Sequence, residues 1–187
     1  MATAAEPRWP VVLPITLEKN LPLVQITVNG AGALTFILDS AAAGCVIDRE
    51  RAAALGLVLS GSGMSSGSGG PQQVGILQGV RLNLGGIEIL PLRSYTFDMK
   101  SLAFQGRVDG ILGSPLFGKY VVEIDYPGCR VRIFQPDSYR PSSKAEVLPM
   151  RMTIGPVVRG SMRVRGKEPI EAVFDLLAVG KVNVAVL

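Results

Sequence analysis

The chain has 187 residues, enough for one domain or for one domain and a fragment of a second. Hydrophobic residues make up 48% and charged residues 18%, which provides a core and excludes an intrinsically disordered protein. The formal net charge of +4 is too small to indicate nucleic-acid binding without a concentrated basic patch. The absence of histidine excludes Ser-His-Asp and Cys-His catalysis and histidine-ligated zinc from this chain. Acid–base chemistry near neutral pH must therefore use carboxylates.

The first long uncharged stretch, residues 20–38, predicts a β-hairpin. Residues 23–28 and 34–38 are rich in β-branched and apolar side chains, and Asn29-Gly30 between them is a strong turn signal. Proline, glycine, glutamine and asparagine interrupt its apolar character, so we expect no membrane span here. The second strand of this hairpin leads directly to Asp39.

The next segment predicts a short strand, a short helix and a loop. Residues 45–47 favour a strand, and Asp48 is suited to cap the N-terminus of a helix over residues 49–55 that Gly56 closes. Residues 60–70 consist mainly of glycine and serine, which is typical of a flexible loop. A strand over residues 74–84 is expected to follow.

Turn signals recur through the rest of the first 135 residues. Gly85-Gly86 and Pro127-Gly128 favour hairpins, and Ser114 followed by Pro115 predicts an N-cap and the first position of a second short helix. Many short strands with two brief helices favour a mostly β barrel or sandwich. The remaining expected strands cover residues 87–95, 110–113, 119–125 and 130–134.

An internal repeat indicates the domain organisation. Five identities recur at an offset of 136 residues, each copy in a turn-strand-Asp context, which predicts a duplication. The second copy is too short for a complete lobe. We expect a disordered tail over residues 1–10, one lobe over 11–136, and a linker with an incomplete second repeat over 137–187. The repeated residues are Gly30, Asp39, Ala42, Gly44 and Val46 in the first copy and Gly166, Asp175, Ala178, Gly180 and Val182 in the second.

Positive charge is concentrated between Arg130 and Lys167, which contain nine basic and two acidic residues. The charges are scattered and only two aromatic residues lie among them, so we interpret the stretch as a solvated strand face. No nucleic-acid partner is expected. The two cysteines, Cys45 and Cys129, are too few for a disulfide scaffold or a four-cysteine metal site, and Cys45 is expected to be a small buried residue.

The motif that carries chemistry is Asp39-Ser40-Ala41-Ala42, directly after the apolar residues 36–38. Small residues let another backbone approach the carboxylate closely, and the serine hydroxyl can hydrogen-bond across a tight loop. An aspartate after a strand also commonly caps local amides, so this structural role stands as the alternative to catalysis. Asp109, ahead of a short buried run, is expected to be a turn residue.

This motif resembles the Asp-[Ser/Thr]-[Gly/Ala]-Ala signature of aspartic peptidases, and Ile111-Leu112-Gly113 is similar to the hydrophobic-hydrophobic-Gly segment of the retropepsin-like family. The resemblance covers residues 21–134. It implies a retropepsin-like barrel lobe with a flap over residues 60–75. It also implies a catalytic Asp39, supported by Ser40, Ala41 and Ala42. The implied activity is acid-favouring hydrolysis of an extended peptide or protein by a water held between two carboxylates, with no metal and no cofactor.

One chain offers a single well-formed half of such a site, because Asp175 is followed by Leu176-Leu177 where the signature has small residues. Activity would need a second Asp39 across a homodimer, or a second lobe that this chain lacks. Two further hypotheses stay open. The chain could be a catalytically inactive peptide-binding or dimerisation module of the same fold, or a fragment of a two-lobe protease.

Overall fold

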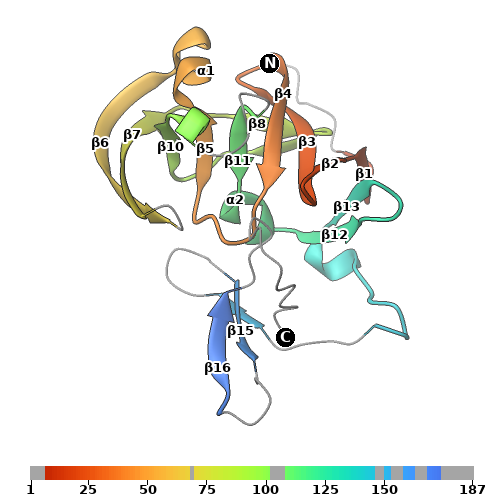
Figure 1. The fold of residues 1–187 in the computed structure, drawn as a ribbon. Coiled ribbons are helices and arrows are strands. Elements are labelled where there is room, and N and C mark those ends of the chain that lie inside the picture. Colours follow the sequence, from red (N-terminus) through yellow and green to blue (C-terminus); the bar gives the residue numbers. More distant parts are fainter. Residues whose placement is uncertain are drawn as a thin grey trace.

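The computed structural model describes residues 7–67, 70–101, 108–145, 150–152, 158–162 and 168–173. Within them, strands predominate over two short helices, α1 (Arg49–Ala54) and α2 (Ser114–Phe117), which confirms the mostly β character (Figure 1). The strands of the main sheet are β2 (Thr16–Glu18), β3 (Leu21–Val28), β4 (Ala31–Leu38), β5 (Cys45–Asp48), β6 (Val58–Gly67), β7 (Gly70–Gln78), β8 (Leu82–Leu84), β9 (Ile87–Ile89), β10 (Ser94–Phe97) and β11 (Gly110–Leu112). Their order is β6-β7-β10-β5-β11-β4-β3-β8-β9, with β2 paired to β3.

Two tight turns set the register of this sheet, as the sequence predicts. Asn29 and Gly30 have φ angles of 51° and 82°, the left-handed pair that a two-residue hairpin requires. They join β3 to β4, whose strands pair from Leu23↔Ile37 onward. Gly85-Gly86, with φ angles of 60° and 92°, joins β8 to β9 in the same way.

β11 is the central strand of the lobe, because it runs parallel to β4 on one side and antiparallel to β5 on the other. All three of its residues are buried. Leu112 belongs to the large hydrophobic core with Phe36, whereas Ile111 packs into a smaller cluster with Ile37. Burial on both faces explains why this strand reads as a continuous apolar run in the sequence.

Helix α1 begins as expected. The Asp48 carboxylate Oδ1 accepts hydrogen bonds from the backbone N–H groups of Glu50 at 3.0 Å and Arg51 at 3.2 Å. Gly56 follows the last turn with a φ of 65°, the left-handed conformation that ends many helices. The cap also ties α1 to the end of β5, from which Asp48 comes.

The glycine- and serine-rich stretch is not the flexible loop that its composition suggests. It forms β6, which pairs with β7 from Val58↔Gln78 to Gly67↔Gly70. The backbone ladder supplies hydrogen bonds that do not depend on side chains, so small residues still form a strand when a partner lies alongside. Figure 1 shows these two strands bowing outward together at one side of the molecule.

Three other local predictions were wrong. The expected strand over residues 74–84 is interrupted at Gly79, which has a φ of 66°, between β7 and β8. The expected strand over residues 87–95 is divided into β9 and β10, with Pro91 in the connection, because proline cannot donate to a ladder. Ser114 is the first residue of α2, and Gly113 occupies the cap position that we expected Ser114 to fill.

Two smaller sheets complete the described structure. β1 (Val11–Pro14), β13 (Arg130–Phe134) and β12 (Val121–Asp125) form one, and Trp9 before β1 stacks on Tyr120 with ring centroids 5.5 Å apart. β14 (Met150–Met152), β15 (Val158–Met162) and β16 (Ile170–Val173) form the other. Asp175 lies outside the described residues, so the incomplete second repeat stays a prediction.

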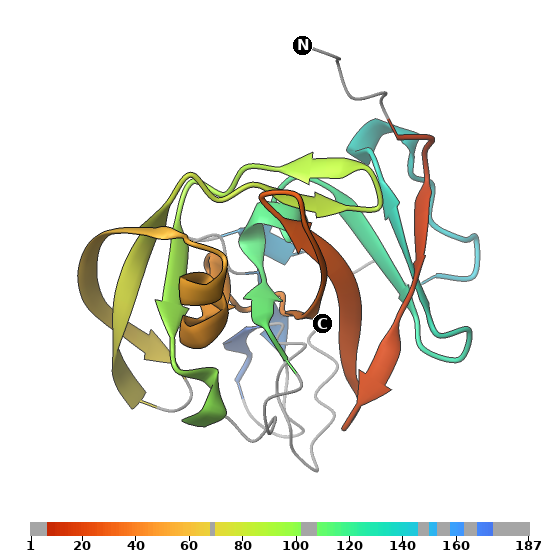
Figure 2. The same ribbon diagram turned by 90° about the horizontal axis from the view of Figure 1, so that it is seen from above.

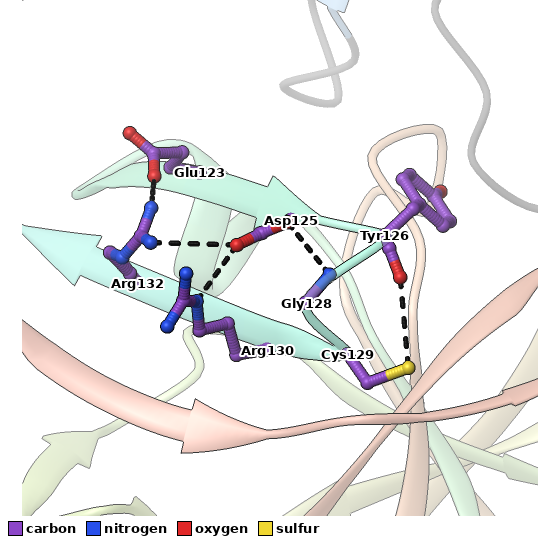
Figure 3. A network of polar contacts seen from close by, with 7 residues as sticks. All are labelled: Glu123, Asp125, Tyr126, Gly128, Cys129, Arg130 and Arg132. Carbon is purple, nitrogen blue, oxygen red and sulfur yellow. Dashed lines mark hydrogen bonds and ion pairs between the residues drawn. The ribbon is translucent and has the colours of Figure 1, made fainter.

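Part of the basic stretch is neutralised across the β12–β13 hairpin (Figure 3). Arg132 pairs with Glu123, its cross-strand partner, and Arg130 Nε lies 2.8 Å from Asp125 Oδ2. The hydrogen bond from the Gly128 N–H has the largest effect on Asp125 and lowers its pKa below the usual value. The hydrogen bond from Arg130 lowers the pKa further. The stabilisation that Asp125 contributes to the folded chain is therefore fully present above the ordinary carboxyl pKa. It is lost as the pH falls through the lowered pKa of Asp125. This pairing supports a structural interpretation of these charges.

The packing at Gly110 generates a stability prediction. A Cβ at Gly110 would lie 2.5 Å from the Val46 carbonyl oxygen and would overlap the Phe36 ring. We expect Gly110→Ala to lower the free energy of unfolding by about 1–3 kcal/mol, because the clash involves backbone and a fully packed ring. Gly32→Ala in the neighbouring β4 is the matched control, since no atom lies within 4 Å of its added Cβ. Urea unfolding measures both, and equal midpoints for the two variants would contradict the packing argument.

The two cysteines are predicted to differ in reactivity. Cys45 is 0% exposed, and burial raises its pKa to about 12, whereas Cys129 is exposed. We expect iodoacetamide at pH 8 to modify one thiol of the native chain and two in denaturant, because alkylation needs an accessible thiolate. Mass spectrometry identifies the modified residue, and Cys129→Ala should leave the native chain unmodified. Rapid native modification of Cys45 would contradict its burial.

Candidate active site

Asp39 is the first residue after β4 and begins the loop to β5. Its backbone N–H donates to the Leu112 carbonyl oxygen of β11 at 3.1 Å, so the parallel ladder continues for one residue beyond the strand. Asp39 is 5% exposed and Ser40 is 2% exposed. The central strands of the lobe therefore fix the backbone that carries the carboxylate.

The loop after Asp39 folds back on the carboxylate. Asp39 Oδ1 accepts a hydrogen bond from the Ala41 N–H at 2.8 Å, and the Asp39 carbonyl oxygen accepts one from the Ala42 N–H at 3.3 Å. This hydrogen bond from a backbone amide fixes the orientation of the carboxylate. The loop thus provides both a local cap, as the structural hypothesis requires, and a fixed orientation, as catalysis requires.

The structure brings the two sequence motifs together at this loop. The Ser114 N–H donates to the Ala42 carbonyl oxygen at 2.9 Å, and the Gly113 N–H donates to the Gly44 carbonyl oxygen at 3.2 Å. A Cβ at Gly113 would overlap the Ala42 carbonyl group and side chain. Only glycine at this position lets α2 and β11 approach the Asp39 loop so closely.

The other buried carboxylates near these strands lie at their opposite end. The Asp109 N–H donates to the Thr35 carbonyl oxygen at 2.8 Å, which places Asp109 four residues, or about 13 Å, along β4 from Asp39. Asp109 in turn accepts the Asp48 N–H on its carbonyl oxygen at 2.8 Å. Neither carboxylate is therefore positioned to share a proton with Asp39.

Asp109 and Asp48 have structural partners. Asp109 Oδ2 accepts a hydrogen bond from the Thr35 N–H at 2.8 Å, and Asp109 Oδ1 lies 2.6 Å from Arg51 Nε. Asp48 Oδ2 accepts a hydrogen bond from the Met99 N–H at 3.2 Å. The hydrogen bond and charge of Asp109 raise the pKa of Arg51. The expectation of a structural Asp109 agrees with these contacts. No local pattern indicates the role of Arg51, because its partner is 58 residues away.

The β6–β7 hairpin occupies the flap segment that the resemblance implied. Figure 1 shows its free end reaching toward the end of the lobe where the loop between β4 and β5 lies. Met64 on β6 is 69% exposed, whereas Phe97 packs against the smaller cluster with Ile37. Of these apolar side chains, Met64 is thus available for contact with a ligand.

The described residues also bear on metal and membrane hypotheses. Among them, no three or more histidine, cysteine or acidic side chains form a group that could hold a metal ion. None of the helices in the described ranges is long and apolar enough to cross a membrane.

Comparison with known proteins assigns the family. No curated protein matches the chain in sequence. The chain is similar in structure to a retropepsin-like aspartic protease from Rickettsia conorii, with 14% identity and a TM-score of 0.47, over 71% of this chain and 96% of that one. Residues 24–116 match the family model described as aspartyl protease, and this segment contains both Asp39 and Gly113. Through this segment, the chain belongs to the aspartyl protease family.

Proposed function

We propose that the chain is one half of an aspartic endopeptidase in which Asp39 is one of the two carboxylates that activate water. The observation that carries the proposal is the fixed position of Asp39. Its Oδ1 accepts the Ala41 N–H, and its loop is packed against Gly113 inside the segment that matches the family. Ser40, Ala41 and Ala42 support the loop, and the reaction needs no cofactor.

The chemistry follows from a pair of carboxylates that share one proton. Two such groups about 3 Å apart cannot both ionise readily, so they titrate as a unit. The ionised carboxylate takes a proton from water while the water oxygen attacks the peptide carbonyl carbon. The protonated partner gives its proton to the carbonyl oxygen, which forms a tetrahedral intermediate. The first carboxyl then gives its proton to the leaving nitrogen, the partner takes back a proton from a hydroxyl group of the intermediate, and the C–N bond breaks.

The second carboxylate is proposed to be Asp39 of a second copy of the chain. A two-fold axis beside the loop would place identical groups together, since the two sides of such an interface are the same surface. The alternative donor is Asp175 in the incomplete second repeat over residues 137–187, where Leu176 follows the carboxylate. We favour the homodimer because only Asp39 has the small residues that permit close approach.

The substrate is proposed to be an extended segment of a peptide or protein. The family is one of proteases, so a peptide is the expected ligand. β6 lies at one edge of the main sheet, and a bound segment in extended conformation can pair with such an edge. Met64 and its neighbours on the flap would contact side chains of that segment.

Asp39→Asn tests the catalytic role. The amide cannot accept a proton from water, so we expect hydrolysis of an unstructured protein between pH 3 and pH 7 to fall by at least about 10²-fold. Asp98→Asn, at an exposed site outside the loop, is the matched control and should retain the parent rate. Circular dichroism confirms that both variants are folded. If folded Asp39→Asn cleaves as fast as the parent, Asp39 is not one of the catalytic carboxylates. If neither chain cleaves, the inactive binding module becomes the better description.

A subunit-mixing experiment tests the source of the second carboxylate. Parent chain at fixed concentration is mixed with increasing Asp39→Asn chain, and mixed dimers then hold one Asp39. We expect activity to fall as the variant is added and to rise in proportion to the total chain when the active control Asp98→Asn is added instead. Asp175→Asn should keep the parent rate. Loss of activity in Asp175→Asn, without inhibition in the mixture, would show that the pair forms within one chain.

A further inference from the structure

A cleft of about 750 Å³ lies beside the Asp39 loop. Ala43 and Gly44 of that loop line it, together with Ser114 at the start of α2 and Tyr95 of β10. Leu90, Leu92 and Arg93, from the connection between β9 and β10, also line it. We call this space the β9 cleft. Since Ala43 and Gly44 belong to it, the cleft is continuous with the loop that holds the candidate catalytic carboxylate.

The connection between β9 and β10 exposes two large apolar side chains. Leu90 is 67% exposed and Leu92 is 97% exposed. Single exposed leucines are ordinary on a protein surface, but these two border a cleft that also contains the Tyr95 ring. An apolar side chain of a ligand can be buried against them.

The charge of the β9 cleft is positive. Its charged residues are Glu88, Arg93 and Lys119. Glu88 is neutralised by Arg81, whose Nε lies 2.9 Å from Glu88 Oε1. Within the described ranges neither Arg93 nor Lys119 has a carboxylate partner, and the Lys119 ammonium lies 5.3 Å from the centre of the Tyr120 ring. Two cations beside apolar surface favour a ligand that combines carboxylates with apolar groups.

The cleft also runs beside a free strand edge. Among the described residues β9 pairs only with β8, and it ends the order of the main sheet. Because Leu84↔Ile87 flanks a two-residue turn, the alternation of an antiparallel pair directs the Glu88 N–H and C=O away from β8. Figure 2 shows the β8–β9 hairpin along the margin of the molecule. An extended backbone can therefore hydrogen-bond to Glu88 while its side chains enter the cleft.

A second cavity continues the same surface past Glu88 and Lys119, which line both spaces. It measures about 390 Å³ and is bordered by Trp9 and Tyr120. Together the two cavities follow the free edge of β9 in both directions, which suits a linear ligand of several residues better than a compact one.

We propose that the β9 cleft is an exosite that binds an extended, acidic segment of the protein substrate with leucine-like apolar side chains, outside the site of hydrolysis. This inference rests on the proposed function, because the bound segment is a substrate only if the chain is a protease. Leu90 and Leu92 receive the apolar side chain, Arg93 and Lys119 pair with carboxylates, and the β9 edge aligns the backbone. Continuity with the Asp39 loop makes the bound segment and the cleaved segment neighbours along one chain.

A binding experiment tests the exosite independently of catalysis. The Asp39→Asn chain is titrated into a fluorescein-labelled octapeptide containing three glutamates and two leucines, and polarisation is recorded. We expect saturable binding that weakens with salt, and at least tenfold weaker binding of the matched peptide with lysine in place of glutamate. Adding Arg93→Glu and Lys119→Glu should weaken binding of the acidic peptide at least tenfold. The matched control, Arg140→Glu with Lys144→Glu at exposed positions outside the cleft, should bind like the parent.

The kinetic experiment uses active chain with two substrates. For a protein substrate with an acidic, leucine-containing segment, Arg93→Glu with Lys119→Glu should raise KM at least fivefold and leave kcat unchanged. Hydrolysis of a six-residue peptide should not change, because it is too short to reach the exosite. If no chain hydrolyses either substrate, the proposed function fails while the binding experiment still decides the exosite.

Three outcomes would overturn the inference. The first is equal affinity for the glutamate and lysine peptides, and the second is equal affinity of the charge-reversed and control variants. The third comes from Leu92→Ser, which cannot disturb the core because Leu92 is almost fully exposed. If this variant retains peptide binding but loses self-association in sedimentation, the cleft is an interface between copies of the chain.

Discussion

The contact between Gly113 and Ala42 is the constraint on which the site depends. Any side chain at position 113 would occupy the space of the Ala42 carbonyl group, so the close approach exists only because neither position carries bulk. This approach lets the backbone of Gly113 and Ser114 bond to the loop, and the loop in turn holds the Asp39 carboxylate through the Ala41 amide. The backbone that carries this acidic group is thus held by a close approach that glycine at position 113 permits.

The carboxylates at the two ends of the central strands differ in their contacts. At the end near α1, Asp48 and Asp109 have both oxygens occupied by backbone amides or by Arg51, and they join α1, β4 and β11. At the other end, Asp39 is held by the short loop that follows it. A lobe built this way can keep one end rigid as a scaffold while the other end carries chemistry. The exposed leucines and unpaired cations of the β9 cleft lie at the second end.

Local signals predicted the parts of the fold that local forces determine. The Asn29-Gly30 turn and the Asp48 cap are each complete within a few residues, so their sequence was sufficient. The Asp39 motif is equally local, and its catalytic role stays a prediction. The strand β6 was missed because its stability comes from a ladder with β7, not from its glycines and serines. The Arg51–Asp109 pair was missed for the same reason, since 58 residues separate partners that only the folded sheet brings together. The β9 cleft likewise joins segments that no local pattern connects.

The composition of β6 has a consequence for molecular recognition. Gly61 and Gly63 present almost no bulk, and no heavy atom lies within 4 Å of a Cβ built at Gly63. Around Gly63 the β6–β7 ribbon is therefore held chiefly by its main chain, whereas Gly75 packs closely against Leu59 and Thr96. The part around Gly63 can change curvature with little rearrangement of side chains. Glycine also loses more backbone entropy on ordering than other residues do. A ribbon of this kind can conform to ligands of different shapes, but it binds each of them less tightly than a rigid ribbon would.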